Sequence, residues 1–77
     1  MTNREKYINA FKTSFETEAE VEKFQFNVTP EWDSIGHMCL ITALEEEFEV
    51  EFEPDEIMGI LSFEKGMEVL KAKGIEI

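Results

Sequence analysis

Apolar side chains recur at helical spacing near the start of the chain. They are separated by intervals of three and four residues, which places them on one face of an α-helix. The positions concerned are Tyr7, Ile8, Phe11 and Phe15. Thr2 or Asn3 can cap this helix, because both side chains accept hydrogen bonds from free N–H groups of a first turn. We expect the apolar face to pack on a hydrophobic core.

The helical period is lost from Glu16 to about Trp32. Apolar residues are mixed there with acids and with turn formers, at Val21, Phe24, Phe26 and Val28. A loop of this length in a small protein has to be anchored or functional. We therefore predict a long loop pinned to the core by its aromatic side chains, in which one irregular turn can occur.

The second helix has the clearest pattern. Asp33 or Ser34 can cap it, and it runs to about Phe48. At 100° per residue one broad apolar face contains Met38, Leu40, Ile41, Leu44 and Phe48. The opposite face carries Ile35, Cys39, Thr42 and Glu46. Because that outer face has apolar and small side chains near its start, it suits a partner protein better than bulk water.

The remaining third of the chain predicts two more helices. "EFEVEFEPDE" alternates acids with apolar residues, but a lone strand would have no partner, so we expect an extended connection with its apolar side chains inward. A short helix begins at Pro54 and ends at about Met58. Ser62 caps a last helix whose inward residues are Phe63, Met67 and Leu70, with Gly74 as its stop. The predicted fold is all-α: a small four-helix bundle with a short third helix and a long loop between helices 1 and 2.

Composition limits how such a fold is held together. The chain has 77 residues, of which 43% are hydrophobic and seven are phenylalanine, and we expect one domain over residues 1–77. A single cysteine and a single histidine exclude an internal disulfide and an ordinary Cys/His zinc site. Burial of apolar side chains must supply the stability.

The charge narrows the choice of partners. Seven basic against 18 acidic residues give a formal net charge of −11, which repels nucleic acid and anionic membranes and attracts basic surfaces. No apolar leader or bilayer-length segment is present, so we expect no membrane insertion. With its lone thiol the chain is expected to be cytoplasmic and monomeric.

Enzyme chemistry has little support in the sequence. Ser34 has one histidine nearby, His37, but no oxyanion-hole loop is evident, so a hydrolase is not expected. Calcium-loop and phosphate-binding glycine motifs are missing. We expect His37 to be a half-buried, hydrogen-bonded residue on the core side of the helix. Residue patterns alone therefore indicate an acidic helical interaction domain, and Ser34 is either a helix cap or a functional residue.

Three motifs in a fixed order indicate a more specific function. Asp33-Ser34-Ile35 opens an amphipathic helix that ends in "ALEEEFEVEF", and a short helix opening "PDE" follows. From about Thr29 to Leu70 the chain resembles the acyl carrier protein family. The resemblance implies that Ser34 carries a 4′-phosphopantetheine, attached from coenzyme A by a phosphopantetheinyl transferase. The arm would hold acyl or aminoacyl groups as thioesters for fatty-acid, polyketide-like or other specialised biosynthesis, and the chain itself would catalyse nothing.

The same resemblance implies a docking face for basic surfaces of the transferase and of the enzymes that load and use the cargo. The corresponding positions are Asp33, Ile35, Met38, Thr42, Glu45 and Glu46. Many fatty-acid carriers have acids where this chain has Gly36 and Cys39, and together with Trp32 this difference favours a specialised carrier. The alternative is an unmodified acidic adaptor that has the carrier fold and binds a basic partner.

Overall fold

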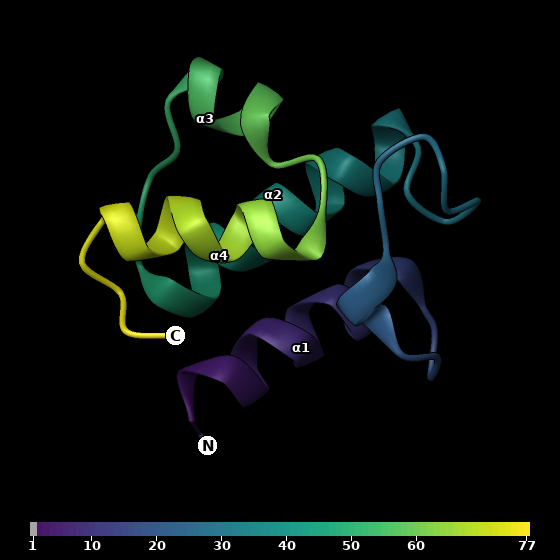
Figure 1. Ribbon diagram of the computed structural model, residues 1–77, viewed down its shortest axis with the longest axis horizontal. Coiled ribbons are helices and arrows are strands. Elements are labelled where there is room, and N and C mark those ends of the chain that lie inside the picture. The colour runs from purple at the N-terminus through teal and green to yellow at the C-terminus, as the bar shows by residue number, and fades with distance from the viewer. Residues whose placement is uncertain (1) are drawn as a thin grey trace.

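The chain folds into helices joined by irregular segments (Figure 1), as the computed structural model of residues 2–77 shows. The elements are α1 (Asn3–Phe15), a 3₁₀ turn η1 (Val21–Lys23), α2 (Ser34–Phe48), α3 (Pro54–Gly59) and α4 (Phe63–Ala72). Within the described residues, strand pairing is limited to an isolated bridge between Gln25 and Ser62. The prediction of an all-helical protein is confirmed.

Local sequence explains where the helices begin. The Glu5 N–H donates to Thr2 Oγ1 (3.1 Å) and the Thr2 N–H to Glu5 Oε1 (3.0 Å), a capping box, so Thr2 is the cap of α1. Ser62 caps α4 by accepting from the Lys65 N–H (3.2 Å). α3 begins at Pro54, as predicted, and extends one residue beyond the predicted end, to Gly59.

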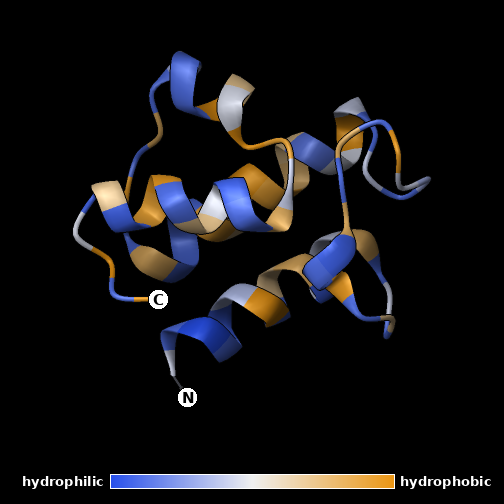
Figure 2. Ribbon diagram, in the orientation of Figure 1, coloured by the Kyte–Doolittle hydropathy of each residue, from blue (hydrophilic) through white to orange (hydrophobic). Residues whose placement is uncertain are grey.

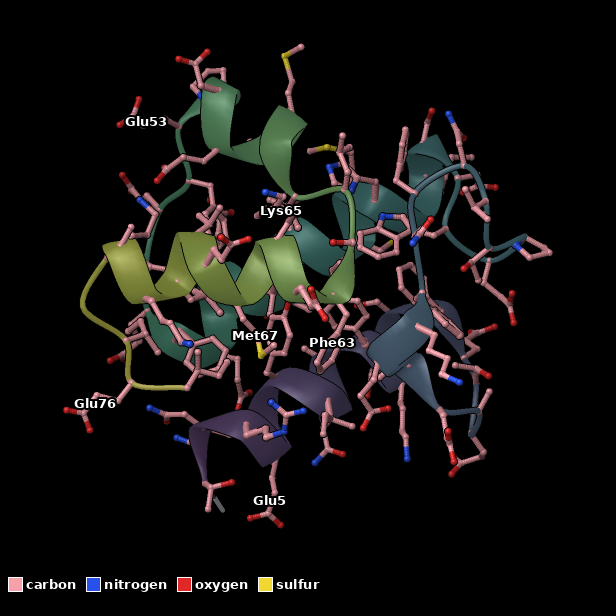
Figure 3. The ribbon with its side chains drawn as sticks, in the orientation of Figure 1. Glu5, Glu53, Phe63, Lys65, Met67 and Glu76 are labelled. Atoms are coloured by element: carbon pink, nitrogen blue, oxygen red, sulfur yellow. The ribbon has the colours of Figure 1, made fainter. Side chains whose placement is uncertain are left out.

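The core is built around the ring of Phe11. Four other aromatic rings lie with their centroids 4.9 to 5.8 Å from it, those of Tyr7, Phe15, Trp32 and Phe63. Figure 3 shows Phe63 and Met67 projecting from α4 toward α1. Such tilted and edge-on ring pairs add specific attraction to the burial of large apolar surfaces.

Tyr7 joins α1 to α4 directly. Its hydroxyl donates to the Phe63 carbonyl (2.6 Å), and burial raises the pKa of Tyr7. Gly66 makes this approach possible, because a β-carbon at that position would collide with the Tyr7 hydroxyl. The closeness of the two helices therefore depends on a tyrosine and a glycine far apart in the sequence.

One side of α2 is buried in this core, and it is narrower than the sequence predicts. His37, Leu40, Ile41 and Leu44 are buried. The prediction that Met38 belongs to the core face is wrong: Met38 is 51% exposed. It lies about 100° around the helix from His37 and so beyond the edge of the buried face. Phe48, the last residue of α2, is only half-buried.

The segment after α2 runs extended with its apolar side chains inward, as predicted. The Phe52 N–H donates to Glu45 Oε2 (3.0 Å), and the Phe52 ring is buried. Farther on, Glu56 accepts from Lys73 Nζ (2.8 Å) and from the Glu53 N–H (2.7 Å), and these two contacts lower the pKa of Glu56. Lys73 thereby ties the end of α4 to α3.

The segment between α1 and α2 is held by backbone and side chain. Of the predicted aromatic anchors, Phe24 is buried and Phe26 is half-buried. Val21 is also buried, whereas Val28 is 72% exposed. The Phe26 N–H donates to the Leu61 carbonyl (2.9 Å), which fastens the segment to the hydrophobic connection between α3 and α4, orange in Figure 2. The segment then ends at Trp32, which is fully buried.

A buried hydrogen-bond chain starts at Trp32. Its indole Nε1–H donates to His37 Nδ1 (2.9 Å), and His37 Nε2 lies 2.7 Å from the Ile57 carbonyl oxygen. The indole N–H can only donate, so Nδ1 accepts and carries no proton. The Ile57 carbonyl can only accept, so the proton is on Nε2, and the His37 ring is neutral. The prediction of a hydrogen-bonded histidine on the core side of α2 is confirmed, but His37 is buried rather than half-buried.

Two truncations on the same helix test the burial pattern. Leu44→Ala should lower the free energy of unfolding by about 2 to 5 kcal/mol, because Leu44 is fully buried. Phe48→Ala should cost less, since part of the Phe48 ring is already in contact with water. Chemical denaturation followed by circular dichroism measures both values. An equal or larger loss for Phe48→Ala would contradict this description of the core.

The Trp32–His37 hydrogen bond can be measured by a double-mutant cycle with Trp32→Phe, His37→Phe and the double variant. His37→Phe alone leaves a buried indole N–H without its acceptor, which costs about 1 to 3 kcal/mol. The double variant removes donor and acceptor together, so its loss of stability should be smaller than the sum of the single losses. Strict additivity would show that the two side chains do not interact.

Candidate functional site

Ser34 is the first residue of α2 and its side chain is exposed. The cap of this helix is its neighbour: Asp33 Oδ1 accepts from the Gly36 N–H (2.8 Å). Of the two predicted cap residues, the structure uses Asp33. The Ser34 hydroxyl is therefore not needed to begin the helix, and it is accessible from solvent.

The residues on either side of Ser34 are rigidly held. Trp32 lies two residues before it and His37 three residues after it, and both are buried and bonded to each other. The Trp32 N–H also donates to the Thr29 carbonyl (3.0 Å), and the Trp32 carbonyl accepts from the Asn27 N–H (2.9 Å). An exposed hydroxyl is thus displayed on a short segment whose two ends are fixed in the core.

Gly36 lies where the preceding segment crosses the first turn of α2. A β-carbon at this position would lie 2.5 Å from the Glu31 carbonyl oxygen and 3.1 Å from a carbon of the Phe15 ring. Any side chain here would force the backbone or the ring to move. Packing alone therefore accounts for a glycine at position 36.

The two ends of α2 differ in charge. Its first turn contains no acidic residue, and the helix dipole makes this end positive, so an anion attached at Ser34 would be favoured. The last turn has no basic residue and contains Glu45, Glu46 and Glu47. Acids at the negative end of a helix oppose its dipole, and so helix stability does not explain them.

An open groove runs between the C-terminal end of α1 and the outer face of α2. Its volume is about 780 Å³. Thr13 and Ser14 of α1 form one wall together with Glu16, which follows that helix. The other wall is formed by residues of α2, including Ser34, Ile35, Met38, Cys39, Thr42 and Glu46. Ser34 is thus both the exposed first residue of α2 and part of an apolar groove.

The docking residues that the resemblance implies separate into two groups. The structure brings Ile35, Met38, Thr42 and Glu46 together along the groove, and Ile35 is 78% exposed. Asp33 is the helix cap, and Glu45 is half-buried and bonded to the Phe52 N–H. Sequence reasoning missed the α1 wall, whose residues are small or polar and carry no motif.

Other kinds of site find no support in residues 2–77. No group of three or more His, Cys, Asp or Glu side chains is arranged to hold a metal ion in this part of the chain. None of its helices is long and apolar enough to cross a membrane. Comparisons with protein families, with curated proteins and with solved structures give no match to this chain.

Proposed function

We propose that this chain is an acyl carrier protein in which Ser34 bears a 4′-phosphopantetheine arm. The observation that carries the proposal is the Ser34 hydroxyl, exposed at the first residue of α2 while Asp33 provides the cap. It stands within the Asp-Ser-Ile, "ALEEEFEVEF" and "PDE" motifs, in the order in which the carrier family has them. Bound to Ser34, the arm would supply the thiol that holds acyl or aminoacyl groups as thioesters.

The surroundings of Ser34 fit a phosphodiester. The linkage would bring a negative charge to the positive end of α2, where free N–H groups and the dipole stabilise anions. Trp32 and His37 keep the serine in a fixed position for the modifying enzyme. The order of four helices with a short third member also agrees with the small bundle expected of a carrier.

A carrier without catalytic activity agrees with the state of His37. Both of its ring nitrogens are engaged, one by the Trp32 indole and one by the Ile57 carbonyl. No nitrogen is left to take a proton from the Ser34 hydroxyl, as a serine hydrolase requires. Chemistry would then be done by partners: the phosphopantetheinyl transferase and the enzymes that load and use the cargo.

The outer face of α2 is the docking surface in this proposal. Ile35 and Met38 offer exposed apolar contacts beside Ser34, and Glu46 and Glu47 offer charges for a basic partner. Since packing explains Gly36, Cys39 remains as the difference on the exposed face of α2 that concerns partner choice. Cys39 is exposed, so an acid there would meet no steric obstacle. This single change supports partners other than those of ordinary fatty-acid synthesis.

A second candidate function rests on the same acids. An unmodified adaptor that binds a basic protein would use Glu46 and Glu47, which lie exposed at the end of α2 where they do not stabilise the helix. Both functions need these acids, and only the carrier needs the hydroxyl of Ser34.

Modification of Ser34 is tested by intact mass after incubation with coenzyme A, magnesium and a broad-specificity phosphopantetheinyl transferase. The wild-type chain should gain the mass of one phosphopantetheine, and Ser34→Ala should gain none. Ser14→Ala is the matched control, because Ser14 lines the same groove, and it should be modified like the wild type. An unmodified wild type, or equal modification of Ser34→Ala, would leave the adaptor as the better proposal.

Gly36→Asp tests whether packing dictates the glycine. Although leaving glycine raises helix propensity, the contact with the Glu31 carbonyl should make the variant less stable by about 1 to 3 kcal/mol. Cys39→Glu introduces an acid on the exposed face of the same helix and should melt close to the wild type. Thermal melting measures both. If Gly36→Asp melts at or above the wild-type temperature, the close approach of residue 31 does not determine this position.

A further inference from the structure

We infer that His37 is a proton-sensitive latch that holds α3 against the first turn of α2. The inference does not depend on an arm at Ser34, because every contact that it uses is present in the unmodified chain. α3 lies at the edge of the molecule, on the side away from α1 (Figure 1). Such a latch makes the attachment of α3, and the hold on the Trp32 side chain close to Ser34, depend on pH.

α3 is attached to the rest of the protein mainly by polar contacts. None of its six residues is buried, although Glu56 and Ile57 are half-buried. The Ile57 carbonyl accepts from His37 Nε2 (2.7 Å), and Glu56 accepts from Lys73 Nζ (2.8 Å). A helix of six residues is too short to persist by itself in water. If the bond to His37 is lost, the turn that contains Ile57 should therefore detach and unfold.

The surroundings of the His37 ring accept only its neutral form. Nδ1 accepts from the Trp32 indole N–H (2.9 Å), so a proton on Nδ1 would point at a group that can only donate. The residue is only 7% exposed, and the Phe26 ring lies with its centroid 5.0 Å from the imidazole. An imidazolium here would lose the bond to Trp32 and hold its charge away from water, which costs free energy. The proton is taken up once His37 has left this environment.

No acid is in place to pair with an imidazolium at this position. The acids on the elements that surround the ring are Glu31, Asp33, Glu53, Asp55 and Glu56. In the part of the chain that the structure describes, none of them forms an ion pair with His37. Asp33 accepts from the Gly36 N–H, and Glu56 is engaged by Lys73.

The direction of the pH effect follows from where the proton can bind. In the closed arrangement both nitrogens of His37 are engaged and the ring is neutral. In an open arrangement the ring meets water, where an imidazole gains a proton below about pH 6.5. The open arrangement therefore binds one more proton and is favoured as the pH falls. The hydrogen bond from Lys73 lowers the pKa of Glu56, so the second tie of α3 persists where the first is released.

Hydrogen exchange tests the latch on the unmodified chain, whose single tryptophan gives a single indole N–H signal in NMR spectra. Exchange of the Trp32 indole N–H and of the Ile57 amide is measured at about pH 7.5 and about pH 5.5. Unstructured peptides at each pH correct for the intrinsic rate. Protection of both groups should fall about tenfold at the lower pH, as uptake of one proton requires. The Phe11 amide, inside α1, should be better protected at both pH values, because opening of α3 leaves α1 in place.

His37→Gln is the matched control. The glutamine amide can accept from the Trp32 indole and donate to the Ile57 carbonyl, but it takes up no proton in this pH range. The tenfold fall in protection should therefore be absent from the variant. Repulsion among the acids also changes with pH, but it is common to both chains and cancels in the comparison.

Several results would overturn the latch. One is unchanged protection of the wild type at the two pH values, and another is an equal fall in His37→Gln. Equal protection of the Trp32 indole and the Phe11 amide at each pH also overturns it, because Trp32 would then be released only when the whole protein unfolds. If His37→Gln does not fold, the His37 ring signals of the wild type decide. A protonated ring beside a still protected indole N–H overturns the latch, whereas a fall in indole protection with the closed ring still neutral supports it.

Discussion

The hydrogen-bond chain from the Trp32 indole through the His37 ring to the Ile57 carbonyl determines how the rest of the structure is arranged. It joins the end of the long connecting segment, the first turn of α2 and the body of α3 through one neutral imidazole. Trp32 also packs edge-on against Phe11, at the centre of the aromatic core. Because Trp32 before Ser34 and His37 after it are fixed in this way, the serine can be exposed and still hold one position.

In this arrangement α2 has a buried inner face and an exposed outer face. Leu40 and Leu44 on the inner face are fully buried, so their size and shape are constrained by close packing. Ile35, Met38 and Thr42 on the outer face are exposed, and substitutions there cost the fold little. The outer face can therefore vary in sequence while the inner face preserves the scaffold. Gly36 is an exception to this freedom of substitution, because the Glu31 carbonyl and the Phe15 ring leave no space for a side chain there.

The helices could be predicted from the sequence because their signals are local. Capping by Asp33 and Ser62, and the end of α4 just before Gly74, depend on residues a few positions apart. The exposure of Met38 was harder to predict. The apolar residues of α2 span a wider arc of the helix than the other elements cover, and Met38 lies outside the covered part.

The features of the site that depend on long-range contacts were not predictable. The contact between Tyr7 and Gly66 sets the distance between α1 and α4. No residue pattern in either helix predicts this contact. In the same way, the groove exists only once α1 and α2 lie beside each other. Its α1 wall consists of small or polar residues that look like ordinary solvent-facing positions. Gly36 had an apparent functional meaning in the sequence, and its steric cause emerged only from the position of the Glu31 carbonyl.

The acids at the end of α2 differ in what they contribute to the fold. Of the three consecutive glutamates, Glu45 has a structural task, since its carboxylate holds the extended segment at Phe52. Glu46 and Glu47 are exposed at the negative end of the helix dipole, in a chain whose net charge is already −11. Their repulsion weakens the fold slightly in the free protein, and a basic surface docking there would relieve it. The charge that makes the isolated chain less stable would therefore favour a complex with a basic surface, whether or not Ser34 carries an arm.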